Sequence, residues 1–451
     1  MITLPKFKPV LLLFLLPGIP LLAQHPVLER YVQEGLNNNL SLKQEQVALE
    51  KNKASVEAAK RLYYPTIALQ GSYSLATGGR TIDFPVGDLL NPVYATLNEM
   101  TQSSQFPMLE NVKEQLSPNN FADIKVRTTM PLINPDIRIN KKAEQEKTAI
   151  QELQIRRTER DLTYQIKSAY FNYLQAGEAV KIYESALDLL KENLRVNQSL
   201  LKNDKINKAP VLRIEAEISK VNAELVQART KRHNAAAYFN TLLHRPLDAA
   251  IEFANLPSPD SLVQTGAILQ PTGVQGREEI QQLDKALYLN QLAMDAAHNY
   301  NKPRLNAFVD LGGQGFLSDI NKNVPYALGG LQLEWNLWNG NRNRWQERQV
   351  AFEATQLNLQ RQDVVSQFQL RQNIAVEEVR AAYESLNAGK QELAAASEYF
   401  RVVERSYRED MASYIEYLDA RTQLTNARLQ ISLKAYQLWG QIAALERETI
   451  D

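Results

Sequence analysis

Four short segments of the chain alternate between apolar and polar side chains. They are residues 66–76, 122–132, 305–314 and 327–337. A period of two residues places successive side chains on opposite faces of a β-strand, so the pattern predicts four strands. Phe308 is the one residue that interrupts the alternation of the third segment. A strand of about ten residues is also long enough to cross a bilayer when it is tilted.

Longer stretches of the chain have the apolar spacing of α-helices. The longest run over 136–203 and 341–408, and shorter ones over 26–63, 208–244, 276–301 and 412–448. In each of the two longest stretches, core positions are separated alternately by four and three residues, which predicts coiled-coil-like packing. The positions are Leu162, Ile166, Ala169, Tyr173, Ala176, Val180, Tyr183, Leu187, Leu190 and Leu194, then Ala375, Val379, Ala382, Leu386, Gly389, Leu393, Ala396, Phe400, Val403 and Tyr407.

The order of these elements occurs twice along the chain. The sequence VEAAKRLYYP at 56–65 and the sequence MDAAHNYNKP at 294–303 both end a helical stretch at a proline, before an alternating segment. We interpret 24–244 and 276–451 as two structural repeats. Each repeat has a helix, a strand pair, a long helix and a further helix. The proline- and glycine-rich segment 245–275 is then a connector between them.

The strand pair of the first repeat has a long connection, residues 79–120. Prolines punctuate it at Pro85, Pro92, Pro107 and Pro118. We expect it to contain a short helix near 108–116. A loop of this length is more often functional, or a plug, than a simple connector.

The N-terminus has the pattern of a secretory signal peptide. Lys6 and Lys8 precede an apolar run over 10–16, and a small residue, Ala23, follows. This arrangement predicts a signal peptide over 1–23, with cleavage near Ala23, and export from the cytoplasm.

Composition limits the classes of function. The 451 residues contain 51 Lys and Arg, 51 Asp and Glu, and no Cys. Zero net charge argues against nucleic acid as a partner, and the absence of Cys excludes disulfides, thiolate metal sites and a lipidated N-terminal cysteine. The four histidines show no metal-ligand spacing, and no catalytic or phosphate-binding motif occurs. We therefore expect no enzyme activity, no cofactor and no metal.

Four strands from one chain are too few to close a barrel in a membrane, because such barrels begin at about eight strands. The strands therefore form either a small soluble sheet or a barrel to which several chains contribute, and three chains would supply twelve. Five aromatic residues lie near the predicted strand ends, where they would form interfacial girdles or simply pack. They are Tyr63, Tyr64, Tyr73, Trp335 and Trp338.

Several stretches together resemble the TolC-like outer membrane efflux proteins, the outer membrane factors of tripartite efflux and type I secretion systems. The clearest is SYIEYLDAR at 413–421, just after the predicted turn that joins the helices 341–408 and 412–448. Its counterpart is VLRIEAE at 211–217, after the turn that joins the helices 136–203 and 208–244. LWNG at 337–340 resembles the strand-to-helix turn of this family, and AALER at 443–447 resembles its C-terminal ending. The resemblance extends from about Leu28 to Arg447.

The resemblance implies a mainly α fold with a small β part. It implies long coiled-coil-like hairpins and four transmembrane strands per chain. Three chains would form a twelve-stranded barrel in the bacterial outer membrane and a helical tunnel in the periplasm. The implied partners are a periplasmic adaptor (membrane fusion protein) and an inner-membrane pump, and the implied function is a passive exit duct. The family often has glycine at the helix turns where this chain has Asp204 and Asp410.

The helix turns are the candidate site for gating or for docking of partners. Their candidate residues are Asp204, Lys205, Lys208, Arg408, Asp410 and Ser413. Asp and Asn tolerate the left-handed conformation that such turns can require. The alternative interpretation is that these are simple helix hairpins. The alternative function for the whole chain is a periplasmic coiled-coil adaptor or scaffold, which would explain the helices and the signal peptide but not four strands of bilayer length.

Overall fold

A computed structural model describes residues 26–117, 119–254, 256, 263, 273–316, 324–409 and 411–449. The expected signal peptide, much of the expected connector and Asp410 lie outside these residues. The chain forms two compact units. Unit 1 comprises Met1–Asn52, Lys147–Tyr288 and Ala354–Asp451, and unit 2 comprises Lys53–Glu146 and Leu289–Glu353. Each unit thus contains segments from both halves of the sequence.

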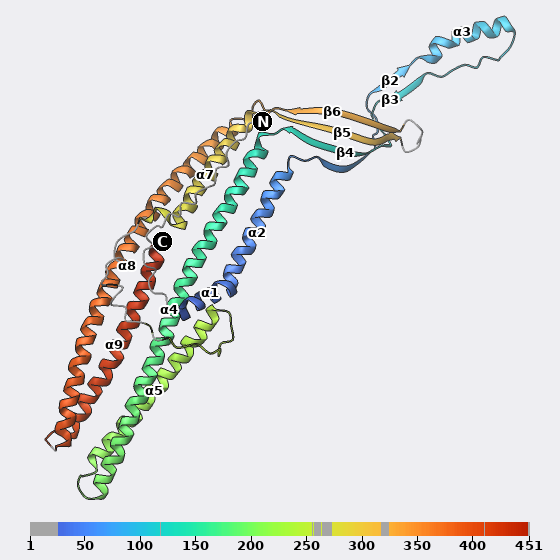
Figure 1. Ribbon diagram of the computed structural model, residues 1–451. Coiled ribbons are helices and arrows are strands. Elements are labelled where there is room, and N and C mark those ends of the chain that lie inside the picture. Colours follow the sequence, from blue (N-terminus) through green and yellow to red (C-terminus); the bar gives the residue numbers. More distant parts are fainter. Residues whose placement is uncertain are drawn as a thin grey trace, which may run out of the picture. The chain divides into compact units, whose positions relative to one another are not determined.

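Unit 1 consists of helices. Its elements are α1 (Pro26–Asn38), the first part of α2 (Leu40–Arg61), most of α4 (Pro135–Lys202), α5 (Ala209–Leu242), η2 (Val274–Gly276), most of α7 (Glu278–His298), most of α8 (Arg342–Arg408) and α9 (Tyr414–Glu448). Within this unit α5 runs beside α4, and α9 runs beside α8 (Figure 1). The long helical stretches predicted from the sequence are confirmed to within a few residues.

The predicted core positions of α4 and α8 are all buried or half-buried. Val180, Leu187 and Leu190 of α4 pack on Ile214 and Leu225 of α5. In the second hairpin, the buried side chains of α8 pack on Leu438 and Ile442 of α9 in the same way. Burial of apolar side chains along these seams is the main force that holds each hairpin together.

The helix expected over 26–63 is interrupted at Asn39. Its Oδ1 accepts hydrogen bonds from the backbone N–H groups of Ser41, at 2.9 Å, and Leu42, at 3.2 Å. Asn39 therefore caps the N-terminus of α2, and α1 and α2 are separate helices.

The four predicted strands form one antiparallel sheet in unit 2. They are β1 (Thr66–Ser74), β4 (Phe121–Ile133), β5 (Arg304–Phe316) and β6 (Pro325–Glu334), in the order β1-β4-β5-β6. β1 and β6 are the two edge strands of this sheet. A short 3₁₀ turn, η3 (Asn299–Asn301), precedes β5.

The connection between β1 and β4 contains more structure than expected. It forms β2 (Thr81–Phe84), α3 (Val86–Thr101) and β3 (Val112–Gln115), and β2 pairs with β3. The helix expected near 108–116 is therefore wrong. The backbone groups of 112–115 are used in pairing with β2, and the helix forms instead directly after Pro85.

Candidate functional site: an amphipathic sheet and two helix turns

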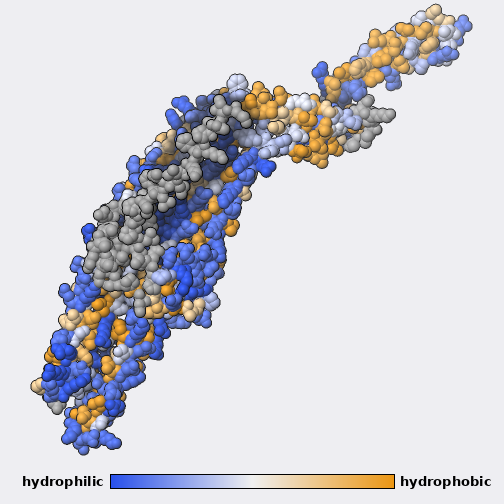
Figure 2. Space-filling model, viewed as in Figure 1, coloured by the Kyte–Doolittle hydropathy of each residue, from blue (hydrophilic) through white to orange (hydrophobic). Residues whose placement is uncertain are grey.

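One face of the four-stranded sheet is almost entirely apolar. The pairing register places on it Ile67, Leu69, Tyr73, Ala122, Ile124, Val126, Met130, Leu305, Ala307, Val309, Leu311, Ala327, Leu331 and Leu333. Thr128 is its polar member. Many of these side chains are exposed, Leu69 at 75%, and Figure 2 shows apolar surface gathered over the strands. An apolar surface of this extent marks a contact with another protein or with a membrane.

The opposite face of the sheet is mainly polar and carries two ion pairs. Arg127 donates two hydrogen bonds to the carboxylate of Asp310, at 2.7 and 2.6 Å, and Asp310 is only 1% exposed. Lys125 donates to Asp123 at 2.8 Å, and the hydroxyl of Tyr326 donates to the same carboxylate at 3.0 Å. The Lys125–Asp123 pair lies within β4, whereas the contacts of Arg127 with Asp310 and of Tyr326 with Asp123 cross from β4 to β5 and β6 and so fix the register of the polar face.

Phe308, which breaks the alternation of its strand, lies on this polar face. The guanidinium of Arg127 lies 5.0 Å from the centre of its ring, a cation–π contact. The residue paired with Phe308 is Gly330, and a Cβ atom there would lie 2.9 Å from the ring. Glycine at 330 therefore makes room for the ring.

The five predicted interfacial aromatics are all exposed and lie at the two ends of the sheet. At one end, Trp335 donates its indole N–H to the carbonyl of Asn301 at 2.9 Å. At the other end, the Tyr73 hydroxyl donates to Asn120 Oδ1 at 2.9 Å. The sequence reasoning missed Phe121 and Phe316, which pack edge to face at this second end, with ring centres 5.5 Å apart. Both lie at strand ends, and this position in the sequence could have identified them as further aromatics of the same kind.

The turn between α4 and α5 has the conformation that the sequence suggested. Asp204 has a φ of 54°, in the left-handed region. The N–H groups of Asp204 and Lys205 donate to the carbonyls of Leu201 and Leu200, at 3.1 and 3.0 Å, which closes the end of α4. Among the described residues, Lys205 and Lys208 form no ion pair, so their charges are free for other contacts.

In the turn between α8 and α9, the predicted residues Ser413 and Arg408 contact residues close to them in the sequence. The Ser413 hydroxyl accepts from the backbone N–H of Glu416, and the Glu416 carboxylate accepts from the N–H of Ser413, which is a capping box. Arg408 pairs with Glu404 at 2.8 Å. Within the described part of the chain, no ion pair joins the predicted charged residues of this turn to those of the other.

An aromatic cluster lies just beyond the second turn and was not predicted. The ring of Tyr417 lies 5.0 Å from that of Tyr407, 5.7 Å from Phe400 and 6.1 Å from Tyr414, between centres. The Tyr417 hydroxyl accepts from Asn193 Nδ2 of α4 at 3.0 Å. Burial raises the pKa of Tyr414 well above its usual range. The cluster joins α8, α9 and α4. Its sequence signal was the aromatic spacing of 400, 407, 414 and 417.

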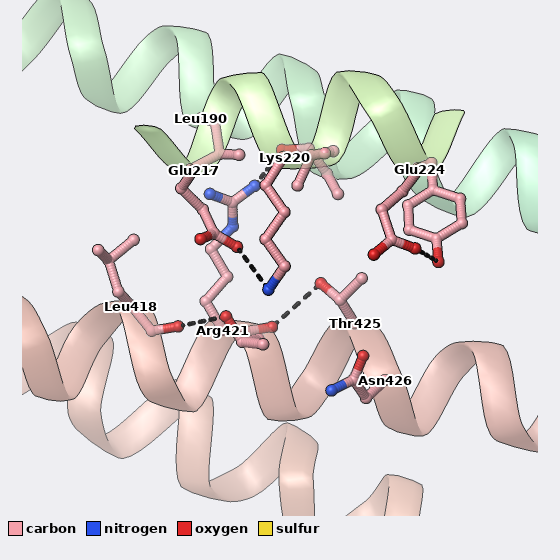
Figure 3. A pocket seen from close by; sticks show the side chains of 12 residues that line it. Leu190, Glu217, Lys220, Glu224, Leu418, Arg421, Thr425 and Asn426 are labelled. Atoms are coloured by element: carbon pink, nitrogen blue, oxygen red, sulfur yellow. Dashed lines mark hydrogen bonds and ion pairs between the residues drawn. The ribbon is translucent and has the colours of Figure 1, made fainter. Parts of the chain in front are cut away.

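A small polar cavity of about 70 Å³ lies between α4, α5 and α9. Glu217, Lys220 and Glu224 of α5 face Arg421 and other residues of α9 across it (Figure 3). Arg421 is 5% exposed and donates to the carbonyl of Ala186. Burial lowers its pKa. The volume would suit a few water molecules and is too small for a large ligand.

A second ionisable group of this cavity is Tyr183. Its hydroxyl donates to Glu224 at 2.7 Å. Burial, followed by this hydrogen bond, raises the pKa of Tyr183 to about 12. No group of three or more His, Cys, Asp or Glu arranged to hold a metal ion occurs among the described residues.

No helix in the described part of the chain combines the length and the apolar character needed to span a membrane.

The chain matches no protein-family model and no curated protein sequence. It is similar to solved outer-membrane channel structures over nearly its whole length. With the outer-membrane channel OprN it shares 17% identity at a TM-score of 0.71, covering 94% of this chain and 90% of OprN. With CusC it shares 15% identity at a TM-score of 0.73, covering 94% of this chain and 91% of CusC. With the outer membrane protein VceC from Vibrio cholerae it shares 15% identity at a TM-score of 0.71, covering 93% of this chain and 95% of VceC. The chain therefore has the TolC-like fold of these outer-membrane channels.

Proposed function

We propose that the chain is the outer-membrane exit duct of a tripartite efflux or type I secretion system. Three copies would join their sheets, β1 of one chain beside β6 of the next, into a twelve-stranded barrel. Such closure leaves no unpaired sheet edge in lipid, where an unpaired backbone group is costly. The helices would form a periplasmic tunnel through which substrates pass without energy input from this protein.

The observation that carries this proposal is the sheet, with one exposed apolar face, one polar face and two free edges. An apolar outer face against lipid and a polar inner face toward water is the arrangement of a membrane barrel. A periplasmic scaffold would have no use for the apolar face. The likeness of fold to known channels supports the same function.

The two helix turns remain the candidate region for contact with a periplasmic adaptor and an inner-membrane pump. Asp204, Lys205 and Lys208 on the first turn carry exposed charge. Three-fold symmetry would repeat each of them as a ring of like charge. Such rings suit either docking or control of ion passage.

The experiment places the same charge on each face of one strand. Leu69→Arg adds a cation to the apolar face at the middle of β1, which costs about 2–4 kcal/mol in a bilayer. Ser72→Arg adds it to the polar face, opposite Asp123. We expect the Ser72 variant to reach the outer membrane and to conduct ions in planar bilayers, and the Leu69 variant to be lost from it. Equal membrane yields for the two variants would contradict a lipid-facing sheet.

A further inference from the structure

The segment that links β1 to β4, residues 75–120, leaves and rejoins the sheet at one place, because Ser74 and Phe121 are paired. We call this segment the arm. Within it, α3 is fixed to the returning chain by asparagine side chains. Asn91 both donates to and accepts from the backbone of Leu109, at 3.0 and 2.8 Å, and Asn98 does the same with Phe106, at 2.8 and 3.0 Å. One face of α3 is thus covered by its own arm.

Another face of α3 is apolar, with three of its five side chains exposed and two, Val86 and Leu97, half-buried. Its residues are Val86, Leu90, Val93, Leu97 and Met100. They are separated by four, three, four and three residues, the spacing of a coiled-coil seam. Val93 is 52% exposed and Met100 78%. The asparagine face and this seam lie on different sides of the helix, so α3 can keep its place in the arm and still pack against another helix.

The charges of α3 indicate what covers the seam. The helix contains Asp88 and Glu99 and no basic residue. Helices that lie on membranes usually carry Lys and Arg beside their apolar face, so an anionic lipid surface is a poor partner. At 100° per residue, both acidic groups lie away from the seam, so identical seams can meet without bringing like charges together.

We propose that the α3 helices of three chains pack together through this seam and form a parallel three-helix cap over the outer mouth of the channel. The inference rests on the trimer proposed above. A helix of 16 residues is only marginally stable when isolated in water. Chains already joined through one barrel hold their arms at an effective concentration on the order of millimolar, which is enough for a weak seam to close. The cap would make opening of the outer mouth a separate step from opening at the periplasmic turns.

Single cysteines test the cap, because the chain contains none. Val93→Cys lies in the seam, and Met100→Cys is a second seam position. Ala95→Cys, two residues from Val93 on an exposed part of the far side of α3, is the matched control. Each variant is extracted in mild detergent, its native mass is measured, and the trimer fraction is oxidised and separated on a denaturing gel without reductant. A separate portion of each trimer, unfolded in denaturant and labelled with a small maleimide, verifies that every variant carries a free thiol.

We expect both seam variants to give a disulfide-linked dimer as the main product, at least tenfold more than Ala95→Cys. Disulfides form only between Cα atoms about 4.4–6.8 Å apart, which the seam would provide and the far side would not. A trimer whose seam variants cross-link no better than the control would overturn the cap and leave the channel proposal intact. A native mass below that of a trimer would overturn both.

Discussion

Tyr417 joins the start of α9 to two other helices, so truncating it should loosen the α8–α9 turn. The ring is 6% exposed and contacts three other aromatic rings, and its hydroxyl accepts one hydrogen bond from Asn193. Removing a buried aromatic ring costs about 3–5 kcal/mol, and losing one neutral hydrogen bond costs about 1 kcal/mol. Tyr417→Ala should therefore destabilise the turn by about 4 kcal/mol and Tyr417→Phe by about 1 kcal/mol.

Native-state hydrogen exchange of the first turns of α9 measures this difference directly. Because about 1.4 kcal/mol corresponds to a factor of ten in an opening equilibrium, the Ala variant should exchange roughly a thousandfold faster, and the Phe variant roughly fivefold faster. Amides of α1, which do not contact the cluster, serve as the internal reference. If the α9 amides exchanged equally fast in the two variants, packing of the Tyr417 ring would not be what stabilises the turn.

Two further predictions concern the sheet and the cavity between α4, α5 and α9. Gly330→Ala should lower the heating temperature at which half of the detergent-extracted protein unfolds, because its Cβ would press on the Phe308 ring. The double variant with Phe308→Ala should recover most of the loss, and no recovery would place the strain elsewhere. For Tyr183, the folded pKa of about 12 lies above the usual value of 10. Its contribution to stability is therefore complete below pH 10 and is lost as the pH rises to about 12. Tyr183→Phe should flatten the fall in stability across this window, measured by denaturant unfolding, whereas an unchanged slope would exclude Tyr183 as its source.

Periodic elements could be predicted from the sequence because one physical pattern determines each of them. Alternation predicted the four strands, because one side of the sheet must bury or shield all its apolar residues together. The interruption at Phe308 was also real, but its partners, Arg127 and Gly330, come from other strands. No local pattern could identify them.

The arm and the aromatic cluster could not be predicted from local sequence patterns. The arm contains elements of only four residues, β2 and β3, whose pairing depends on a chain reversal that the sequence does not signal. Pro92 inside α3 also hid that helix, since proline usually ends one. Asp204 was anticipated because its conformation is a property of the residue itself. Tyr417 was not, because its role depends on contacts from three helices.

The native mass of the protein extracted from membranes in mild detergent shows whether several chains pool their strands in one membrane-inserted barrel. We expect that detergent is required and that the protein mass is close to three chains of 51.2 kDa each, less any cleaved leader. A protein released without detergent, as a monomer or a dimer, would contradict this expectation.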